Sequence, residues 1–262
     1  MTLRDLFGKT AVVTGASSGI GAAVARALRA EGASVALAAR SLAKLEALAD
    51  ELGPNAAPFA MDVADDASVK AGFVAIAERF GEIDVLVNNA GFGKFERVAD
   101  ADDRSFRDMM EVNYFGTVRC TRAVLPGFVA RGAGSIVNVA SVAGKFGTAK
   151  SAGYSATKHA VLGFTNALRQ ELHGTGVHVM AVNPGPVRTA FFEIADPEGG
   201  YVRNIQSMMV TAEDVARALV NGVKRGKAEV NVPRWMGLAA DVHHVLPVPL
   251  INAFAAKFLK LK

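Results

Sequence analysis

The sequence contains little of what marks exported, disulfide-rich or zinc-dependent proteins. Cys120 is the only cysteine among its 262 residues, so no disulfide can form within the chain and a disulfide-stabilised fold is excluded. The five histidines do not form an HExxH pattern, and nothing else indicates a metal site. We therefore expect a reducing, cytoplasmic environment in which Cys120 is a small core residue.

Long apolar segments are also missing. The charged N-terminal residues are followed by an apolar run of only strand length, at residues 10–14, which is not typical of a signal peptide. A membrane-spanning helix needs about 20 apolar residues. The nearest candidate, after residue 244, is interrupted by Pro247 and Pro249. Neither export nor membrane insertion is expected.

The charge balance shows no strong excess of one sign. Lys and Arg number 29 against 25 Asp and Glu, a net charge of +4, and the basic residues are spread along the chain, which does not indicate a nucleic-acid partner. Hydrophobic residues make up 51% and charged residues 21%, proportions that exclude a disordered or fibrous chain. The length suits one large α/β domain, expected to span residues 1–262.

What the sequence does have is a regular alternation of short apolar runs and helical patterns. Runs rich in Val and Ala predict strands at residues 10–14, 34–39, 57–61, 85–88, 135–139, 177–182 and 228–232. Apolar positions at three- and four-residue steps predict helices at residues 20–30, 42–51, 66–80, 103–130, 154–172 and 212–223. Strands that are apolar throughout need cover on both faces. The sequence therefore predicts an α/β, three-layer doubly wound (Rossmann) fold with a seven-stranded parallel sheet.

A glycine-rich stretch, TGASSGIG at residues 14–21, follows the first predicted strand and opens the first predicted helix. Glycines there allow a tight turn and let backbone N–H groups approach a pyrophosphate at the positive end of the helix. The spacing is GxxxGxG and not the commoner GxGxxG, and a simple tight turn is the alternative. The predicted cofactor contacts in this stretch are Gly15, Ser17, Ser18, Gly19, Ile20 and Gly21.

The end of the second predicted strand carries no acidic residue. A carboxylate at this point would accept the ribose 2′-hydroxyl group of a dinucleotide, whereas residues 38–41 read AARS. The guanidinium of Arg40 suits a phosphate, with help from the hydroxyls of Ser17 and Ser41, so NADP(H) is predicted over NAD(H). The alternative is that Arg40 is an exposed charge at a helix entry, without a ligand.

Two further strand ends carry polar or small residues, where ligands collect in parallel sheets. Asp62, followed by Val63, is placed either to pair with the adenine amino group or to form a turn before the next helix. After the fourth predicted strand comes NNAG at residues 88–91. The predicted cofactor contacts at these two strand ends are Asp62, Val63, Asn89, Ala90 and Gly91.

Tyr154 and Lys158 are four residues apart in a predicted helix, so their side chains leave the same face. A nearby ammonium group favours the phenolate and lowers the tyrosine pKa from its usual value of about 10. Ser141 is suited to donate a hydrogen bond to a substrate oxygen, and Asn113 to hold a water that relays protons to Lys158. A Tyr-x-x-x-Lys pair alone also occurs as a solvated helix pair, so the prediction depends on the four residues together.

These motifs together resemble the short-chain dehydrogenase/reductase family along nearly the whole sequence. The matching features are the glycine turn at residues 14–21, Asp62, NNAG at 88–91, the ordered set Asn113, Ser141, Tyr154 and Lys158, and NPG at 183–185 with Thr189. The resemblance implies reversible hydride transfer between NADP(H) and a small-molecule carbonyl or alcohol. In it Tyr154 is the general acid or base and Ser141 polarises the oxygen. Lys158 holds the nicotinamide ribose, and Asn113 completes the proton relay.

The resemblance also implies how the nicotinamide is held and how the protein assembles. The segment from Pro184 to Thr189 would hold the nicotinamide, with contacts from Pro184, Gly185, Val187 and Thr189 in addition to Tyr154 and Lys158. A homodimer or homotetramer is implied, assembled through the helices that begin near Asp103 and Tyr154.

Substrate choice is expected to lie in residues 184–211, a lid over the site, and in the loops after Gly91 and Ser141. No additional Arg or Lys cluster is present there to hold a carboxylate or phosphate, which favours an apolar carbonyl substrate. The alternative is that the same side chains pack the lid or a subunit contact. The residues concerned are Phe92, Phe95, Phe146, Phe191, Phe192, Tyr201, Met208 and Met209.

Residues 235–262 depart from the family pattern and form an extension that combines apolar residues with lysines near its end. An amphipathic helix is expected from Leu250 onward. Its apolar stripe packs on its own domain or a partner subunit, or else lies in a membrane interface with its lysines near anionic lipid; the packed helix is the commoner case.

One functional alternative comes from a different class of protein. A catalytically idle NADP(H)-binding protein could sense redox state or act through a protein partner. Such a sensor has no need of Ser141, Tyr154 and Lys158 together, so the sequence favours the enzyme.

Overall fold

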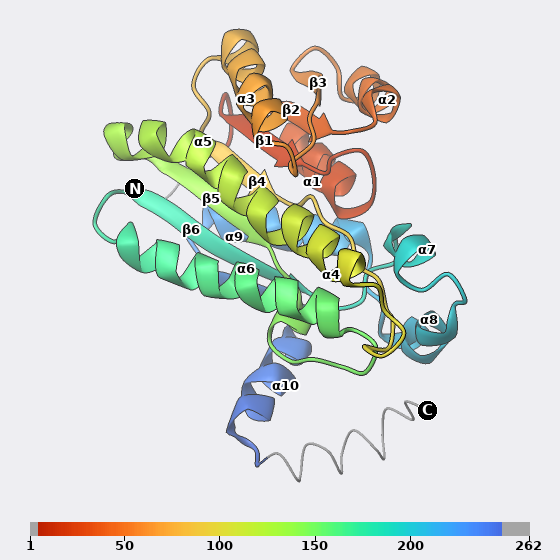
Figure 1. Ribbon diagram of the computed structural model, residues 1–262. Helices are drawn as coiled ribbons and strands as arrows, with labels where there is room; N and C mark the ends of the chain where they lie inside the picture. The colour runs from red at the N-terminus through yellow and green to blue at the C-terminus, as the bar shows by residue number, and fades with distance from the viewer. Residues whose placement is uncertain (1–4, 248–262) are drawn as a thin grey trace.

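The computed structural model describes residues 5–247, and its centre is one parallel sheet of seven strands in the order β3-β2-β1-β4-β5-β6-β7 (Figure 1). The strands are β1 (Thr10–Thr14), β2 (Ser34–Ala39), β3 (Ala56–Ala60), β4 (Val85–Asn88), β5 (Gly134–Val139), β6 (Val177–Pro184) and β7 (Glu229–Val232). The order reverses between β1 and β4: Val12 pairs with Ala36 of β2 on one side and Leu86 of β4 on the other. In such sheets ligands bind beyond the carboxyl ends of the strands at the reversal.

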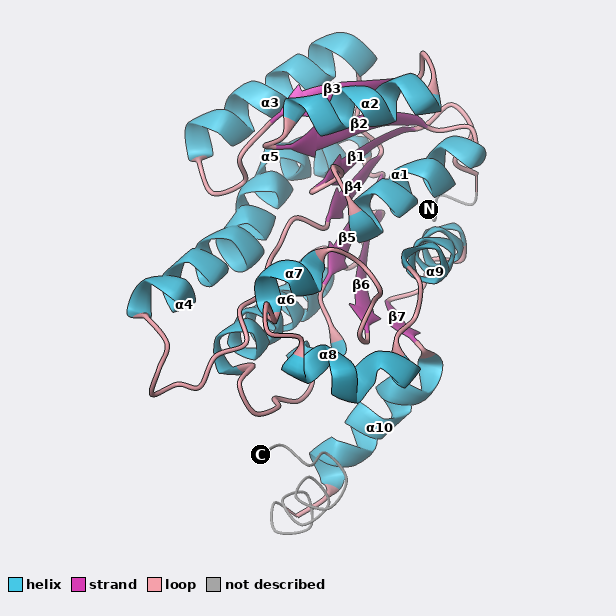
Figure 2. Cartoon of the chain, turned by 90° about the vertical axis from the view of Figure 1, so that its right-hand side faces the viewer, coloured by secondary structure: helices cyan, strands magenta, loops and turns pink. Residues whose placement is uncertain are grey.

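Helices cover both faces of the sheet, as the continuously apolar strands require. One apolar cluster joins the sheet to α1 (Gly19–Ala30), α2 (Leu42–Leu52) and α9 (Ala212–Lys224). A second cluster joins the other face to α3 (Asp66–Phe80), α5 (Gly116–Arg131) and α6 (Ala152–Glu171). Figure 2 shows these layers edge on. The predicted three-layer doubly wound fold with a seven-stranded parallel sheet is confirmed.

The predicted single helix at residues 103–130 is wrong in its middle. The structure has α4 (Asp103–Met110), then one π-helical turn, η1 (Glu111–Phe115), and then α5. The widened turn contains the buried Asn113, whose carbonyl oxygen accepts a hydrogen bond from Thr117 Oγ1 at 2.8 Å. Turns of this type often occur at functional sites, and no periodicity in the sequence distinguishes them from an ordinary helix.

Residues 184–211 begin at Pro184, the last residue of β6, and continue beyond the carboxyl end of that strand. This segment contains α7 (Phe191–Ala195), α8 (Gly200–Ile205) and a 3-10 turn, η3 (Gln206–Met208). An isolated bridge between Val187 and Val210 closes its two ends.

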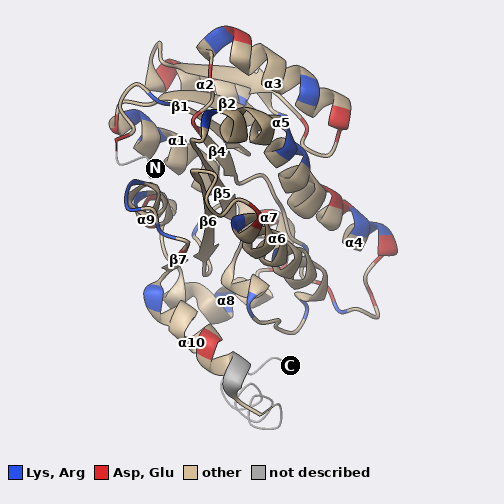
Figure 3. Cartoon of the chain, turned by 90° about the vertical axis from the view of Figure 1, so that its left-hand side faces the viewer, with Lys and Arg blue, Asp and Glu red and all other residues tan. Residues whose placement is uncertain are grey.

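The C-terminal extension begins with a helix that the sequence did not indicate. Helix α10 (Arg234–Val245) starts directly after β7, whereas the helix expected from Leu250 onward lies outside the described residues. Within residues 5–247 no helix is long and apolar enough to cross a membrane. Over the same part of the chain, no group of His, Cys, Asp or Glu is placed to hold a metal ion. Figure 3 shows basic and acidic residues interspersed along the helices on the side drawn there.

Candidate active site

The glycine turn forms a cradle of backbone at the amino end of α1. Gly15 and Gly19 have positive φ angles of 65° and 54°, which L side chains rarely adopt. A Cβ atom on Gly21 would overlap the carbonyl oxygen of Gly15. Ser18, the N-cap of α1, makes no side-chain capping bond, and the first turn carries no acidic residue. The first N–H groups of the helix are thus available to an anion, and the cradle fits the pyrophosphate of a dinucleotide.

The NNAG loop is tied directly to this turn. Thr14 Oγ1 accepts hydrogen bonds from the N–H groups of Asn89 and Ala90, both at 3.0 Å. The Asn89 side chain donates from Nδ2 to the carbonyl oxygens of Thr14 (3.0 Å) and Gly15 (3.2 Å). Two segments 75 residues apart are therefore held in one rigid unit.

Arg40 and Asp62 lie at the carboxyl ends of neighbouring strands. Arg40, directly after β2, is exposed, and it takes part in none of the ion pairs formed within the described chain. Asp62 Oδ1 accepts a hydrogen bond from the N–H of Ala64 at 3.0 Å. One carboxylate oxygen of Asp62 therefore stabilises a turn, as the turn alternative predicts. Val63 is buried, and a Cβ atom on Gly116 would press against it.

Across the sheet reversal, residues 184–189 face the glycine turn. A Cβ atom on Gly19 would lie 3.2 Å from Thr189 Cγ2. The N–H of Gly185 donates to Val232 O at 2.7 Å, and Ser141 Oγ donates to Pro184 O at 3.3 Å. The residues predicted to bind the cofactor therefore lie in two groups: the glycine turn after β1 on one side of the strand reversal, and residues 184–189 after β6 on the other.

The four predicted catalytic residues lie close together at the carboxyl ends of β4 and β5. Lys158 is only 5% exposed; its Nζ donates to Val139 O at 2.9 Å and lies 5.7 Å from the centre of the Tyr154 ring. Gly91 packs closely against both Asn113 and Lys158: a Cβ atom on it would be 2.9 Å from Asn113 Oδ1 and 3.6 Å from Lys158 Nζ. The Ser141 hydroxyl lies near enough to the Tyr154 phenol to lower its pKa, while its own proton is donated to Pro184 O.

Asn113 is fully engaged as a brace. Its Nδ2 donates to Phe92 O (2.8 Å) and to Thr157 Oγ1 (2.9 Å), and its Oδ1 accepts from the N–H of Phe92 (2.9 Å). The side chain thus fixes the loop after NNAG to helix α6. Thr157 had no signal in the sequence, because a threonine between Tyr154 and Lys158 fits any helix. The proton-relay role of Asn113 stays a prediction.

The electrostatics of the pair differ from the sequence expectation. Burial raises the pKa of Tyr154 to about 12, although the nearby Ser141 hydroxyl acts in the opposite direction. Burial also lowers the pKa of Lys158 to about 8. The expected lowering of the tyrosine pKa by the adjacent ammonium group is therefore wrong for the free protein. The desolvation of the phenol outweighs the groups that would stabilise its charged form.

Aromatic rings from three separate segments gather over Tyr154. We call Phe95, Tyr154, Phe191, Phe192 and Tyr201 the aromatic cluster. Phe95 is its hub: its ring centre lies 6.0 Å from that of Tyr154 and 4.7 Å from that of Tyr201. Its N–H also donates to Ala195 O at 2.9 Å. The sequence named these residues as lining, but not that they surround the phenol.

The remaining predicted lining residues lie differently. Phe92 bonds Asn113 through its backbone, and the ring of Phe146 packs on His243 of α10, 5.5 Å between ring centres. Phe146 is therefore directed to the C-terminal helix and not to the aromatic cluster.

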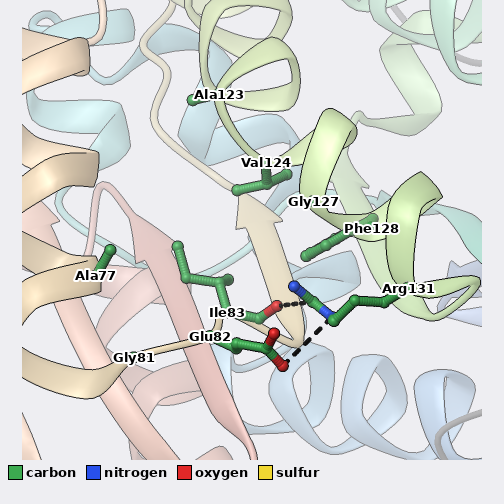
Figure 4. Close-up of a pocket in the computed structure, with 9 residues that line it drawn as sticks. All are labelled: Ala77, Gly81, Glu82, Ile83, Ala123, Val124, Gly127, Phe128 and Arg131. Atoms are coloured by element: carbon green, nitrogen blue, oxygen red, sulfur yellow. Dashed lines mark hydrogen bonds and ion pairs between the residues drawn. The ribbon is translucent and has the colours of Figure 1, made fainter.

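A hollow of about 390 Å³ lies at the opposite end of the sheet, between α5 and the segment joining α3 to β4 (Figure 4). Most of its lining is aliphatic or glycine, including Ala77, Ile83 and Val124. Its two charged groups, Glu82 and Arg131, pair with one another at 3.5 Å. The two charged groups of this hollow are engaged with one another, and none of the predicted catalytic residues lines it, so it is not the candidate active site.

Comparisons with known proteins agree with the arrangement at the carboxyl end. A sequence model of the short chain dehydrogenase family matches residues 9–198. The chain is 48% identical over 187 residues to the putative ketoacyl reductase of the monensin polyketide synthase of Streptomyces virginiae, covering 69% of this chain and 71% of that protein. It is 40% identical over 185 residues to the 3-oxoacyl-(acyl-carrier-protein) reductase of Vibrio cholerae, covering 71% and 76% respectively.

Solved structures give the same result. A variant of actinorhodin polyketide ketoreductase with NADPH has a TM-score of 0.78 at 37% identity, covering 86% of this chain and 95% of that one. A short chain dehydrogenase/reductase of Burkholderia phymatum with NAD has a TM-score of 0.85 at 26% identity, covering 92% and 94%. This chain, with its glycine turn, its strand order and a family match over residues 9–198, belongs to the short-chain dehydrogenase/reductase family.

Proposed function

We propose that the protein is an NADP(H)-dependent oxidoreductase that interconverts the carbonyl and alcohol forms of an apolar small molecule. The observation that carries this proposal is the convergence of Ser141, Tyr154 and Lys158 beside a backbone cradle for a dinucleotide. Hydride transfer to a carbonyl leaves negative charge on oxygen, so the reaction needs a hydrogen-bond donor and a proton source at that oxygen. The site provides both.

In the reducing direction each side chain has a defined task. When bound, NADPH supplies the hydride that reduces the carbonyl carbon. Ser141 Oγ donates a hydrogen bond to the carbonyl oxygen, and Tyr154 Oη gives its proton to that oxygen as charge develops. A pKa of about 12 keeps the phenol protonated at neutral pH, so the proton is in place before the reaction. The phenolate that remains is stabilised by the nearby Lys158 ammonium.

The preference for NADP(H) is supported by charge at the end of β2. An acidic side chain there would repel a 2′-phosphate, whereas Arg40 is cationic, exposed and unpaired within the described chain. The planar, permanently charged guanidinium of an arginine suits a phosphate dianion. The actinorhodin ketoreductase was solved with NADPH, and the Burkholderia protein with NAD, so both cofactors occur among relatives and Arg40 is the feature that distinguishes them here.

An apolar substrate is supported by the aromatic cluster. The ring centres of Phe95 and Phe191 lie 6.0 and 5.4 Å from that of Tyr154, so a substrate held against the phenol would have apolar rings beside it. Displacing water from such rings favours apolar groups. Residues 184–211 act as the lid that carries Phe191, Phe192 and Tyr201. The two ketoacyl reductases among the relatives make ketoacyl compounds natural members of the substrate panel.

Assembly into a homodimer or homotetramer through α4, α5 and α6 is part of the proposal. Phe115 and Val129, on the outward side of this helical layer, are 44% and 43% exposed in the single chain. Light scattering on purified protein would give the mass: two or four times 27.4 kDa supports the assembly, and the mass of one chain refutes it.

The test is the decay of NADPH absorbance with a panel of aliphatic, aromatic, steroid-like and ketoacyl carbonyls, with Tyr154→Phe as the control. Turnover with an apolar member, lost in the control, is the expected result. NADPH binding without turnover of any member would favour the redox sensor. Absence of NADPH binding would refute the proposal.

A further inference from the structure

Helix α10 lies outside residues 9–198, the part of the chain that the family model matches. Met236 and Ala240 on its inner side are buried, whereas Trp235 and Leu238 are exposed. Figures 2 and 3 show the helix leaving the β7 edge of the sheet, and it packs against β7 and against η2 (Val142–Gly144), the 3-10 turn after Ser141. The second of these contacts brings it next to a candidate catalytic residue.

Helix α10 also packs against the backbone that directly follows β6. A Cβ atom on Gly185 would overlap Met236 Sδ, and one on Gly237 would overlap the Asn231 side chain. Asn231 Oδ1 in turn accepts from Asn183 Nδ2 at 2.9 Å. The helix is therefore seated without clearance behind the Pro184–Gly185 segment.

An ion triad joins α10 to β7 and to the loop after η2. Lys145 Nζ lies 2.5 Å from Glu229 Oε1 on β7 and 3.1 Å from Asp241 Oδ1 on α10, and its side chain is only 11% exposed. Burial alone would lower the pKa of Lys145, but the bonds to the two carboxylates reverse this and raise it. Lys145 is thus a charged group that joins three elements: the loop after η2, the edge strand and the C-terminal helix.

Lys145 is connected to the candidate catalytic residues through one short turn, residues 141–145, which we call the Ser141 turn. The N–H of Gly144 donates to Ser141 O and that of Lys145 to Val142 O, both at 2.9 Å. A Cβ atom on Gly144 would lie 2.6 Å from Lys158 O. The Ser141 turn is therefore held between the backbone of Lys158 on one side and the ion triad on the other.

We infer that α10 braces the active site through Lys145, and that Lys145 is a positioning residue which holds the Ser141 hydroxyl in register with Tyr154. This inference rests on the proposed function for its kinetic consequence. A donor displaced by a fraction of an ångström loses much of its effect on the transition state. The glycine turn and Arg40 do not touch the triad, and the contact of α10 with Gly185 is made by Met236 and not by Lys145, so cofactor affinity should depend little on Lys145.

The experiment compares Lys145→Met, Lys145→Arg and Asp241→Asn with the wild type, using NADPH and whichever carbonyl the panel identifies. The Asp241 side chain is 63% exposed, so its change to Asn removes a charge without threatening the fold. Lys224→Met is the matched control, because Lys224 also joins two elements through a half-buried pair, with Glu31 at 2.6 Å. Besides kcat, KM and the Kd for NADPH, hydrogen exchange of the peptide covering residues 139–147 is measured.

We expect Lys145→Met to lower kcat by about tenfold and to speed exchange in that peptide, with the Kd for NADPH unchanged. Asp241→Asn should show both effects in smaller degree. Lys145→Arg should restore both readouts. Lys224→Met should change neither, even if its melting temperature falls as much as that of Lys145→Met. The inference would be overturned if Lys145→Met kept the kcat and the exchange rate of the wild type. It would also be overturned if Lys224→Met lost kcat in proportion to its loss of stability, since the effect would then be one of stability alone. If the wild type itself turns over no carbonyl, the proposed function fails, while unchanged exchange in Lys145→Met still refutes the brace by itself.

Discussion

The nucleotide side of the site is held mainly by backbone, whereas the substrate side is held mainly by side chains. On the nucleotide side, Gly15 and Gly21 pack main chain against main chain, and Asn89 and Thr14 bond backbone atoms. On the substrate side, Phe95 gathers rings from three segments and Lys145 joins two carboxylates. The first side leaves no room for variation, while the second can be altered one side chain at a time.

This difference separates two kinds of loss. Substitutions in the glycine turn should affect cofactor binding and the stability of the fold together. Substitutions at the chemical side should affect turnover while the cofactor still binds. The first two predictions below test that separation, and the next two each test one side chain, Arg40 on the nucleotide side and Lys158 on the substrate side.

The largest effect is expected for Tyr154→Phe. The variant keeps the ring and its contacts with Phe95 and Phe191 but loses the proton. A positioned acid contributes about 10²- to 10⁴-fold, so kcat should fall by that range while the Kd for NADPH stays within about twofold, since a neutral hydrogen bond contributes little net free energy. Steady-state turnover and fluorescence titration give the two numbers. Undiminished kcat would contradict the assigned role.

A strong effect on both binding and stability is expected for Gly21→Ala, because its methyl group would overlap Gly15 O. Overpacking of this kind costs about 1–3 kcal/mol, and the displaced turn should weaken NADPH binding. Gly163→Ala is the control: an added Cβ there meets nothing within 4 Å, and alanine should stabilise α6 by up to about 1 kcal/mol. Equal melting temperatures and NADPH affinities for the two variants would refute the cradle.

A selective effect is expected for Arg40→Ala. Loss of a charge-assisted bond to the 2′-phosphate, about 1.5–3 kcal/mol, should raise the KM for NADPH by about 10- to 100-fold. The KM for NADH should change little, since NADH has no phosphate there. Kinetics with both cofactors measure this directly, and an equal rise for the two would show that Arg40 does not read the phosphate.

The smallest effect concerns the dependence of stability on pH. Lys158 has a pKa of about 8 in the folded protein and about 10.4 when unfolded. Between these values the unfolded chain binds more protons, so stability should rise with pH. From pH 7.5 to 9.5 the wild type should gain about 2 kcal/mol relative to Lys158→Met. Tyr154, with a pKa of about 12, contributes only above about pH 10. Urea unfolding at both pH values gives the difference, and parallel behaviour of the two proteins would contradict the buried, discharged amine.

The sequence was sufficient for the backbone-built side. The strands β1 and β5 are buried along their whole length, as expected for short runs enriched in Val and Ile between turn residues, and the glycines at 15, 19 and 21 occupy positions where a Cβ is strained or excluded. Residues in one helix, such as Tyr154 and Lys158, were also placed correctly, because their spacing fixes their direction.

What the sequence did not indicate depends on contacts between distant segments. The π-helical turn at Asn113 is stabilised by the bonds of Asn113 to Phe92 and Thr157, which no local pattern contains. Helix α10 and its ion pair with Lys145 join residues 96 positions apart. The raised pKa of Tyr154 reflects burial by rings from other segments, whereas the neighbouring charge alone suggested the opposite shift.

The most direct test of the proposed chemistry is a crystal structure of the protein with NADPH bound. It should show the pyrophosphate on the amino end of α1 and the nicotinamide ring beside Tyr154 Oη, with Lys158 Nζ turned from Val139 O toward the ribose. If the nucleotide instead lies elsewhere, or if the phenol and the amine are directed away from its reactive ring, the assignment of hydride and proton transfer to this site is contradicted.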